Sequence, residues 1–190
     1  SLEFHQLDGI YIAGAFGNYL NKKNSIKIGL LPPIEEKKIT FIFTKDIPSF
    51  AVNCEPEKIK RTLGNLLENA FKHTPKGGNI EIILSSPLPY TEDVYKWIWE
   101  RKKPEQVVRI SVQDNGEGIK KEEREFIFRR FWQKGGTGIG LSIVKEYVML
   151  HYGYITVDST EGKGSVFTFY LPCGKEHLKE HEITKDERIS

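Results

Sequence analysis

Two asparagines four positions apart, Asn65 and Asn69, lie in a stretch that otherwise has the composition of an amphipathic helix. Asparagine is a mediocre helix former because its side chain competes for nearby backbone groups. At 100° per residue, the two asparagines share one side of this helix with Arg61, Glu68 and Lys72. Amide oxygens can bind Mg²⁺ without adding charge, and an ammonium group can neutralise phosphate. The pattern indicates a magnesium–polyphosphate site, with a solvated helix face as the ordinary alternative.

Three glycine-containing clusters follow. Residues 114–118 (DNGEG) come after a strand-like run, where Asp114 could accept a hydrogen bond from an exocyclic amine such as that of adenine. Residues 135–141 (GGTGIGL) lead into a predicted helix, whose free N–H groups and dipole would form an anion site. Residues 162–165 (GKGS) are typical of a hairpin turn. Singly, the first cluster is an ordinary turn and the second a linker, whereas together with the asparagines they favour a nucleotide site.

The elements that must position these residues are predicted from periodicity and turn signals. The expected helices are 56–73, 120–131 and a third from about 135 to 151. The first should bury Ile59, Leu63, Leu66, Leu67 and Ala70. The expected strands are 39–44, 50–53, 79–85 and 107–113, followed by a hairpin of 154–159 and 165–171. Without regular βαβ alternation, this order favours an α+β fold, a two-layer α/β sandwich in which helices pack on one face of a mixed β-sheet.

Composition limits the remaining possibilities. The chain has 190 residues and a net charge of +2, which suits one domain with appendages and gives no support for binding nucleic acid. Cys54 and Cys173 match no metal spacing, and we expect unpaired thiols, with a single disulfide as the alternative. No apolar run approaches the roughly 20 residues of a membrane span, and we expect a cytoplasmic location, either free or as part of a membrane-anchored sensor.

The order of the motifs resembles the ATP-binding catalytic domain of sensor histidine kinases, in the superfamily of DNA gyrase B, Hsp90 and MutL. The resemblance covers about residues 37–172 and implies a Bergerat-type fold with ATP between the helical layer and a lid. The motifs that carry it are Asn65…Asn69, Asp114-x-Gly116-x-Gly118, Phe128-x-x-Phe131, Gly136-x-Gly138-x-Gly140, Gly162-x-Gly164 and the ending FTFYLP at 167–172.

The resemblance also implies roles for individual residues. Asn69 would be the Mg²⁺ ligand, Asn65 and Lys72 would act beside the phosphates during transfer, and Asp114 would read adenine. Phe128 and Phe131 would anchor the lid. The other expected nucleotide-binding residues are His73, Gly116, Gly118, Ile119, Gly136, Thr137, Gly138, Ile139, Gly140, Leu141 and Ser165.

The sequence departs from the family pattern in two places near the site. Only residues 132–135 stand where the family usually has a lid of ten or more residues, and Gln133 replaces an arginine. None of the five histidines has the context of a phosphoacceptor, and His151 is expected to be a cap or packing residue. The acceptor histidine is therefore expected on a separate dimerisation domain of the parent protein, with a response-regulator receiver domain as an indirect partner.

The predicted domain organisation has three parts. Residues 1–36 form an atypical N-terminal segment, 37–173 the catalytic domain with an insertion at 86–106, and 174–190 a charged tail. The first segment resembles the C-terminal part of activator ATPases that reductively reactivate corrinoid proteins. A helix with Leu7, Ile10, Tyr11 and Gly14 on one side is the alternative description.

The expected function is that of a sensor histidine kinase catalytic domain, which binds Mg-ATP and transfers the γ-phosphoryl group to a histidine held elsewhere. Two alternatives remain at this stage. One is a nucleotide-binding regulatory module with little transferase activity. The other is an ATP hydrolase or serine kinase of the same superfamily. Hydrolases of this superfamily place a glutamate at the position of Asn65, which argues against hydrolysis.

Overall fold

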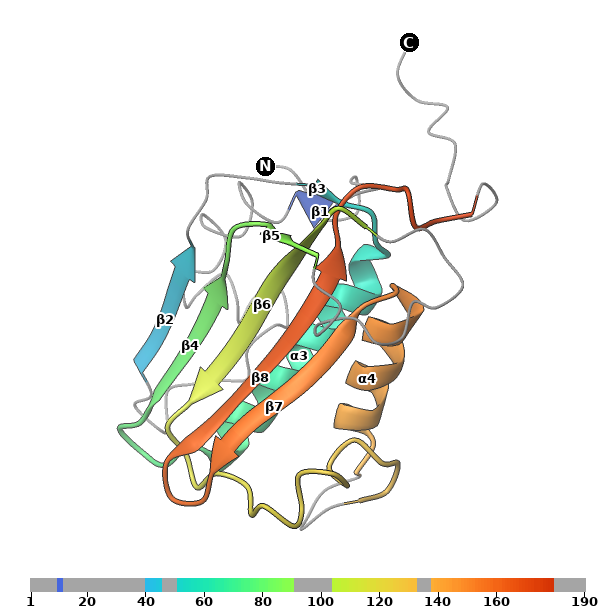
Figure 1. The fold of residues 1–190 in the computed structure, drawn as a ribbon. Coiled ribbons are helices and arrows are strands. Elements are labelled where there is room, and N and C mark those ends of the chain that lie inside the picture. Colours follow the sequence, from blue (N-terminus) through green and yellow to red (C-terminus); the bar gives the residue numbers. More distant parts are fainter. Residues whose placement is uncertain (1–9, 12–39, 46–50, 91–103, 133–137, 180–190) are drawn as a thin grey trace.

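The computed structural model describes residues 10–11, 40–45, 51–90, 104–132 and 138–179 (Figure 1). Its main feature is a six-stranded sheet with the order β2-β4-β6-β8-β7, to which β5 is added through pairing with β6. β2 runs parallel to β4, and the other pairs are antiparallel, so the sheet is mixed. The strands are β2 (Thr40–Lys45), β4 (Asn79–Leu84), β5 (Leu88–Pro89), β6 (Gln106–Asp114), β7 (Tyr154–Thr160) and β8 (Gly164–Pro172).

Two helices, α3 (Pro56–His73) and α4 (Gly140–Leu150), lie against the same face of this sheet (Figure 1). α3 begins with Pro56 in its first turn, where the missing N–H costs nothing, and ends at His73, followed by the C-cap Thr74 and by Pro75. The apolar side predicted for this helix is buried in the core, namely Ile59, Leu63, Leu66, Leu67 and Ala70. The predicted α+β sandwich, a mixed sheet with helices on one face, is confirmed.

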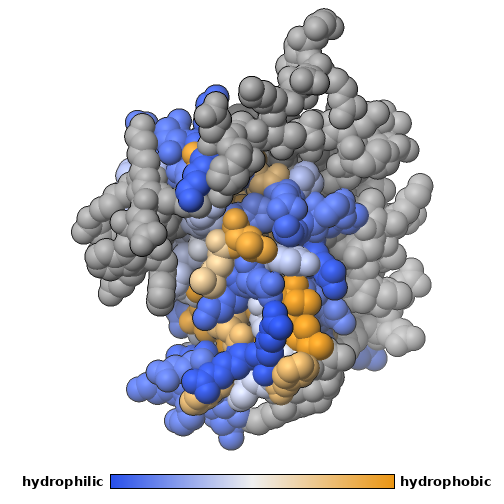
Figure 2. Space-filling model, turned by 90° about the vertical axis from the view of Figure 1, so that its right-hand side faces the viewer, coloured by the Kyte–Doolittle hydropathy of each residue, from blue (hydrophilic) through white to orange (hydrophobic). Residues whose placement is uncertain are grey.

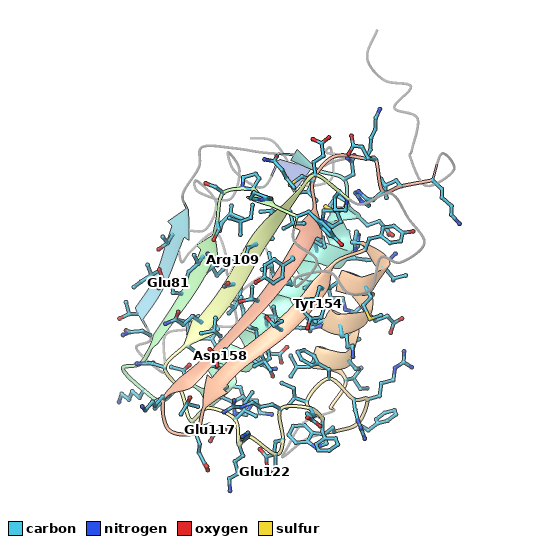
Figure 3. All side chains as sticks on the ribbon, in the orientation of Figure 1. Glu81, Arg109, Glu117, Glu122, Tyr154 and Asp158 are labelled. Atoms are coloured by element: carbon cyan, nitrogen blue, oxygen red, sulfur yellow. The ribbon has the colours of Figure 1, made fainter. Side chains whose placement is uncertain are left out.

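The two faces of the sheet differ in chemistry. On β6, Val108, Ile110 and Val112 are buried beneath the helices, whereas the residues between them belong to the opposite face. In Figure 3, Arg109, Glu81, Tyr154 and Asp158 lie on the strands of the face turned toward the viewer, with both helices behind. A site built from the ends of the helices therefore lies on the other side of the sheet from these polar residues.

The hairpin of β7 and β8 closes tightly over the end of β6. Asp114, the last residue of β6, pairs with Ser165, the second residue of β8. Gly164 has φ of +97°, and a Cβ on it would lie 2.0 Å from the Asp114 carbonyl oxygen. Glycine at this position lets the hairpin approach the strand and places Ser165 beside Asp114.

Residues 120–131 form a succession of turns, and the helix predicted there is wrong. The amides of Glu123 and Arg129 donate to carbonyls three residues earlier, at 3.0 and 2.8 Å, rather than extending an α-helical ladder. Ile127 is buried in the core, and the ring of Phe128 packs edge-on against Phe167 with centroids 6.3 Å apart. Phe131 has φ of +64°, outside the helical region. Tertiary packing therefore decides the path of this segment.

The N-terminal segment contributes one short strand among the described residues. β1 (Ile10–Tyr11) pairs antiparallel with β3 (Ala51–Val52), and Val52 also bridges to Gly174. Ile10 and Tyr11 are thus extended, contrary to the helical alternative for this segment. Most of the predicted insertion lies outside the described residues, but its start supplies β5.

Two smaller expectations can be checked directly. Neither Cys54 nor Cys173 forms a disulfide, as predicted, and each is partly buried. Within the described parts of the chain, no helix has both the length and the hydropathy that crossing a membrane requires.

Candidate functional site

A pocket opens where one side of α3, the loop after β6 and the first turn of α4 meet. It lies at the end of the sheet where β6 finishes and the β7–β8 hairpin turns. Its lining is polar along α3 and in the β6 loop, and apolar toward α4 and the core. The lining residues are Asn65, Glu68, Asn69, Lys72, His73, Asp114, Glu117, Gly118, Ile119, Glu123, Ile127, Trp132, Gly138, Gly140, Leu141, Ser165 and Phe167.

The polar side of α3 forms one wall of this pocket. Asn65, Asn69 and Lys72 all line it, together with Glu68, whereas Arg61 lies outside it. The side-chain amide of Asn65 donates to the Gly140 carbonyl at 3.3 Å and so joins α3 to the first residue of α4. Amide and carboxylate oxygens along one helix face are the donor type that a hard cation such as Mg²⁺ prefers. The wall therefore fits a magnesium-bound phosphate chain chemically.

Asp114 is the buried carboxylate of the pocket, with 7% of its surface exposed. Burial raises the pKa of the Asp114 carboxyl above its ordinary value, while hydrogen bonds from the backbone of Gly116 and Ser165 act in the opposite direction. The Gly116 amide donates to Oδ1 at 2.8 Å. A buried carboxylate fixed by backbone amides is a well-oriented acceptor for an N–H donor on a bound ligand.

The loop after β6 is held between α3 and the β7–β8 hairpin. The Glu117 amide donates to the His73 carbonyl at 3.3 Å, and the Gly162 amide donates to the Glu117 carbonyl at 2.7 Å. Gly118 has φ of +68°, and a Cβ there would lie 2.1 Å from the Thr160 carbonyl oxygen. This loop needs glycine at 118 both for its backbone conformation and for its closeness to the hairpin.

Residues 138–140, which lead into α4, contact the end of segment 120–131, which contains Phe128 and Phe131. The Phe131 amide donates to the Gly138 carbonyl at 2.9 Å, so the two ends that flank residues 133–137 lie together. Gly138 and Gly140 line the pocket from this side. Helix α4 begins at Gly140, and the free amides of a helix N-terminus favour an anion.

The structure brings most of the predicted site residues into this single pocket. Gly116 and Ile139 lie next to lining residues in the chain without lining the pocket themselves. Gly136 and Thr137 lie outside the described residues. The predicted residues found in the lining are Asn65, Asn69, Lys72, His73, Asp114, Gly118, Ile119, Gly138, Gly140, Leu141 and Ser165.

Several lining residues were not predicted. Glu117 lies between two glycines that were singled out, and its side chain contacts His73, with Oε1 2.6 Å from Nδ1. Ile127 and Trp132 line the pocket from the turns at 120–132, and Phe167 lines it from β8. No local pattern marks these residues, because only strand register and turn path place them in the pocket.

The side of the molecule that carries α4 has hydrophobic residues gathered within a largely hydrophilic surface (Figure 2). Exposed apolar residues on or beside this helix include Ile139, Met149 and Leu150, and Phe131 is 75% exposed. Helix α4 and the residues beside it therefore contribute both to the pocket and to this apolar surface.

Comparison with known families identifies two regions of the chain. Residues 54–175 match the family described as histidine kinase-, DNA gyrase B-, and HSP90-like ATPase, and this range contains every described residue of the pocket. Residues 1–43 match the C-terminal domain of RACo, the ASKHA domain, in agreement with the resemblance noted for the N-terminal segment.

Curated relatives are sensor kinases. The adaptive-response sensory kinase SasA of Synechococcus sp. (strain JA-3-3Ab) is 36% identical over 156 residues, which cover 77% of this chain and 37% of that protein. The sensor histidine kinase WalK of Bacillus subtilis (strain 168) is 35% identical over 150 residues, covering 75% of this chain and 22% of that protein. The chain thus spans well under half the length of these relatives.

Solved structures give the same result. The catalytic domain of histidine kinase ThkA matches with a TM-score of 0.59 and 31% identity, over 74% of this chain and 84% of that one. The mycobacterial sensor histidine kinase MprB matches with a TM-score of 0.62 and 26% identity, over 80% and 93% of the two chains. The chain therefore belongs to the family of histidine kinase-, DNA gyrase B- and HSP90-like ATPases, and it carries an ATP-binding catalytic domain of the sensor histidine kinase type.

Proposed function

We propose that this chain is the catalytic part of a two-component sensor histidine kinase, which binds Mg-ATP in the described pocket and phosphorylates a histidine on a separate dimerisation domain. The observation that supports the proposal is the meeting of three features in one pocket. These are the asparagine-bearing wall of α3, the buried Asp114 and the glycines before α4. The α3 wall supplies oxygen ligands for Mg²⁺, and Asp114 supplies a hydrogen-bond acceptor for the base. The start of α4 supplies backbone amides that bind an anion.

In this proposal each wall of the pocket acts on a different part of ATP. Asp114 accepts a hydrogen bond from the adenine amine, and Gly118 leaves room for the base. Asn69 is the protein ligand of Mg²⁺, whose role is to neutralise charge on the phosphates. Lys72 and the amides at the start of α4 bind the phosphate oxygens, beside Asn65.

Catalysis would then rest on positioning and charge neutralisation. Lys72 and the backbone amides hold the γ-phosphoryl group so that the imidazole of the acceptor histidine attacks its phosphorus in line. The bond to the bridging oxygen of ADP breaks in the same displacement. Asn65, whose amide already donates to Gly140, keeps the helices at the distance that this geometry needs.

The environment of Asn65 supports transfer over hydrolysis. A hydrolase needs a general base near the γ-phosphate to activate water, and an amide cannot serve as that base. The contact from Nδ2 to the Gly140 carbonyl requires a donor, so a carboxylate at this position would face a carbonyl oxygen.

The proposal extends to partners and organisation. One solved structure that matches this chain, with a TM-score of 0.55 and 28% identity, is histidine kinase ThkA in complex with the response regulator protein TrrA. We propose a receiver domain as the eventual phosphate acceptor here too, and a cytoplasmic location. We also propose residues 37–173 as the catalytic domain, with 1–36 and 174–190 as appendages and 86–106 as an insertion.

Calorimetric titration of the chain with ATP, in Mg²⁺ and in excess EDTA, tests the binding site. We expect Mg²⁺-dependent binding, its loss in Asn69→Ala, and wild-type affinity in Arg61→Ala, which changes the same side of α3 outside the pocket. Unchanged affinity in Asn69→Ala would exclude Asn69 as the ligand.

A transfer assay tests the kinase function. Labelled ATP is added to the chain together with a separately expressed helical hairpin from the parent that carries the acceptor histidine. Acid-labile phosphorylation of the hairpin is expected. Nucleotide binding without transfer would instead favour the regulatory-module alternative.

A further inference from the structure

The open face of the sheet, which is turned away from α3 and α4, has no role in the nucleotide site. Its side chains come from alternate residues of β4, β6, β8 and β7, because the residues between them pack in the core. Strand register arranges these side chains in three rows that cross the four strands. The acidic row is Glu81, Gln113, Val166 and Asp158, the middle row is Ile83, Ser111, Thr168 and Thr156, and the arginine row is Ser85, Arg109, Tyr170 and Tyr154.

The charged side chains of the two outer rows have no ionic partners within the described part of the chain. No ion pair found there involves Arg109, Glu81 or Asp158. Arg109 is four residues from Gln113 along β6, about 14 Å at the rise of a strand, so it is too far from the acidic row of its own molecule. The Arg109 side chain is held beside β4 instead, because its Nε and Nη2 donate to Ser85 Oγ at 3.1 and 2.8 Å.

The middle row can be covered without leaving its polar groups unpaired. Ser111 and Thr168 are 6% and 9% exposed, and their hydroxyl groups form a hydrogen bond of 2.9 Å with each other. The Thr156 hydroxyl donates to the Thr168 carbonyl at 3.4 Å, and the remaining member of the row, Ile83, is apolar. A surface that packs on this row therefore removes water from groups that already have hydrogen-bond partners.

A second copy of the same face matches this arrangement of charges. A two-fold axis along the middle row places each strand opposite itself in the other copy and exchanges the two outer rows. Arg109, held beside β4, then faces Glu81 of the second copy, and Tyr154 faces Asp158 of the second copy on β7. Sheets that pack face to face lie about 10 Å apart, a separation that these long side chains span. An axis parallel to the strands would instead place Glu81 against Asp158, and like charges oppose association.

We propose that the open face of the sheet is an interface between two copies of this chain. Arg109 pairs with Glu81 across the two-fold axis, and the Tyr154 hydroxyl donates to Asp158. Each contact occurs twice by symmetry, and the helix side of each copy stays open to a ligand. The interface is polar and covers four strands, so we expect weak, reversible association. The inference does not depend on the proposed nucleotide site.

Sedimentation equilibrium of the full chain, up to about 1 mM because small polar interfaces are weak, measures the association. The wild type should form dimers. Arg109→Glu and Glu81→Arg should each weaken the dimer at least about tenfold, because each variant brings like charges together twice. An equimolar mixture of the two variants should restore the wild-type affinity, since the mixed dimer has opposite charges at both positions. Thermal unfolding verifies that each variant is folded.

Glu122→Arg is the matched control. Glu122 is an exposed glutamate in the turns at 120–131, at the lower end of the molecule in Figure 3, so the variant makes the same charge change away from the open face. It should dimerise as the wild type does, and fluorescently labelled Arg109→Glu should bind it at least about tenfold more weakly than it binds Glu81→Arg.

A wild-type chain that stays monomeric over the whole concentration range would overturn the interface. Dimerisation of Arg109→Glu and Glu81→Arg with wild-type affinity would overturn it too, since the dimer would then use another surface. Equal binding of labelled Arg109→Glu to Glu81→Arg and Glu122→Arg would overturn the pairing across the axis. Each of these results leaves the nucleotide site standing, because the pocket lies on the helix side of the sheet.

Discussion

Asp114 is a residue whose surroundings set its chemistry. It ends β6, lies beneath the β7–β8 hairpin and keeps its carboxylate in place through the Gly116 amide. Its burial means that little water competes for the carboxylate oxygens, so a ligand N–H group can replace solvent there at small cost. Under the proposed function, this carboxylate would recognise the adenine base as a hydrogen-bond acceptor and not through its charge alone.

Asp114→Asn should weaken ATP binding by about tenfold or more, because the amide presents a donor where the ligand needs an acceptor. Calorimetric titration gives the affinity, and thermal unfolding verifies that the variant is folded. Asp158→Asn, on the open face of the sheet (Figure 3), provides the same chemical change away from the pocket and should bind normally. Equal affinities in the two variants would contradict the assignment of Asp114.

At the scale of elements, His151 joins the two helices at the end away from the pocket. Its Nε2 accepts from the Glu55 amide at the start of α3 at 2.9 Å, and Nδ1 lies 2.6 Å from the Tyr147 carbonyl in α4. Accepting at Nε2 requires a neutral ring with its proton on Nδ1. The expectation that His151 is a cap or packing residue is confirmed, since it caps the C-terminus of α4.

We therefore expect the free energy of unfolding to decrease in mild acid because of His151. Burial lowers the pKa of this imidazole in the folded chain below its ordinary value of 6.5. Below pH 6.5 the imidazole becomes protonated in the unfolded chain while it is still neutral in the folded chain. The free energy of unfolding therefore decreases as the pH falls from 6.5 toward the lower pKa of the folded chain, and His151 causes no further loss below that pKa. Denaturant unfolding at pH 7.5 and 5.5 measures the effect. His151→Ala should be less stable by about 1–3 kcal/mol at pH 7.5 and show a smaller pH dependence. An identical pH dependence in the variant would exclude His151 as the cause.

The contact between the β6 loop and the β7–β8 hairpin can be tested with two glycines. Both Gly118 and Gly162 have positive φ, of +68° and +78°, but a Cβ would clash with Thr160 only at Gly118. Gly162→Ala should cost about 1 kcal/mol from backbone strain alone. Gly118→Ala should cost clearly more and should also weaken ATP binding, since the loop must move. Chemical denaturation compares the two, and equal losses would mean that the close approach is unimportant.

At the scale of the whole molecule, residues 1–43, which match the RACo domain, pair with the rest of the chain through two strands of different length. β1 pairs with β3 over two residues, whereas β2 pairs with β4 over six. The match to the RACo domain ends at residue 43, within β2. The family boundary therefore does not coincide with a boundary of the sheet.

Deletion of residues 1–36 should leave a chain that unfolds cooperatively and binds ATP within about twofold of wild type, because only the short β1 pairing is removed from the described structure. Deletion of 1–45 also removes the edge strand β2, and it should lower the melting temperature much further. Calorimetric titration and thermal unfolding of both variants test the proposed start of the domain at 37. Loss of binding in the shorter deletion would show that the N-terminal segment is part of the catalytic unit.

Periodicity and glycine spacing were sufficient to predict α3, the main strands and the residue types of the pocket. The 3.6-residue repeat of 59–70 and the alternation along β4 reflect burial on one side of each element, which local sequence records directly. The same reasoning failed at 120–131, where the charge and hydrophobicity pattern suggested a helix. There the burial of Ile127 and the packing of Phe128 on Phe167 determine the path instead.

The sequence alone determined which chemical groups are available: two amides on one helix side, a carboxylate at a strand end and glycines before a helix. The tertiary structure decided which of them meet. Strand register set Ser165 beside Asp114, and the hairpin contact put Glu117 against His73. The physical reason is that local patterns report how each element buries its own faces, whereas distances between residues far apart in the chain depend on how all the elements pack together.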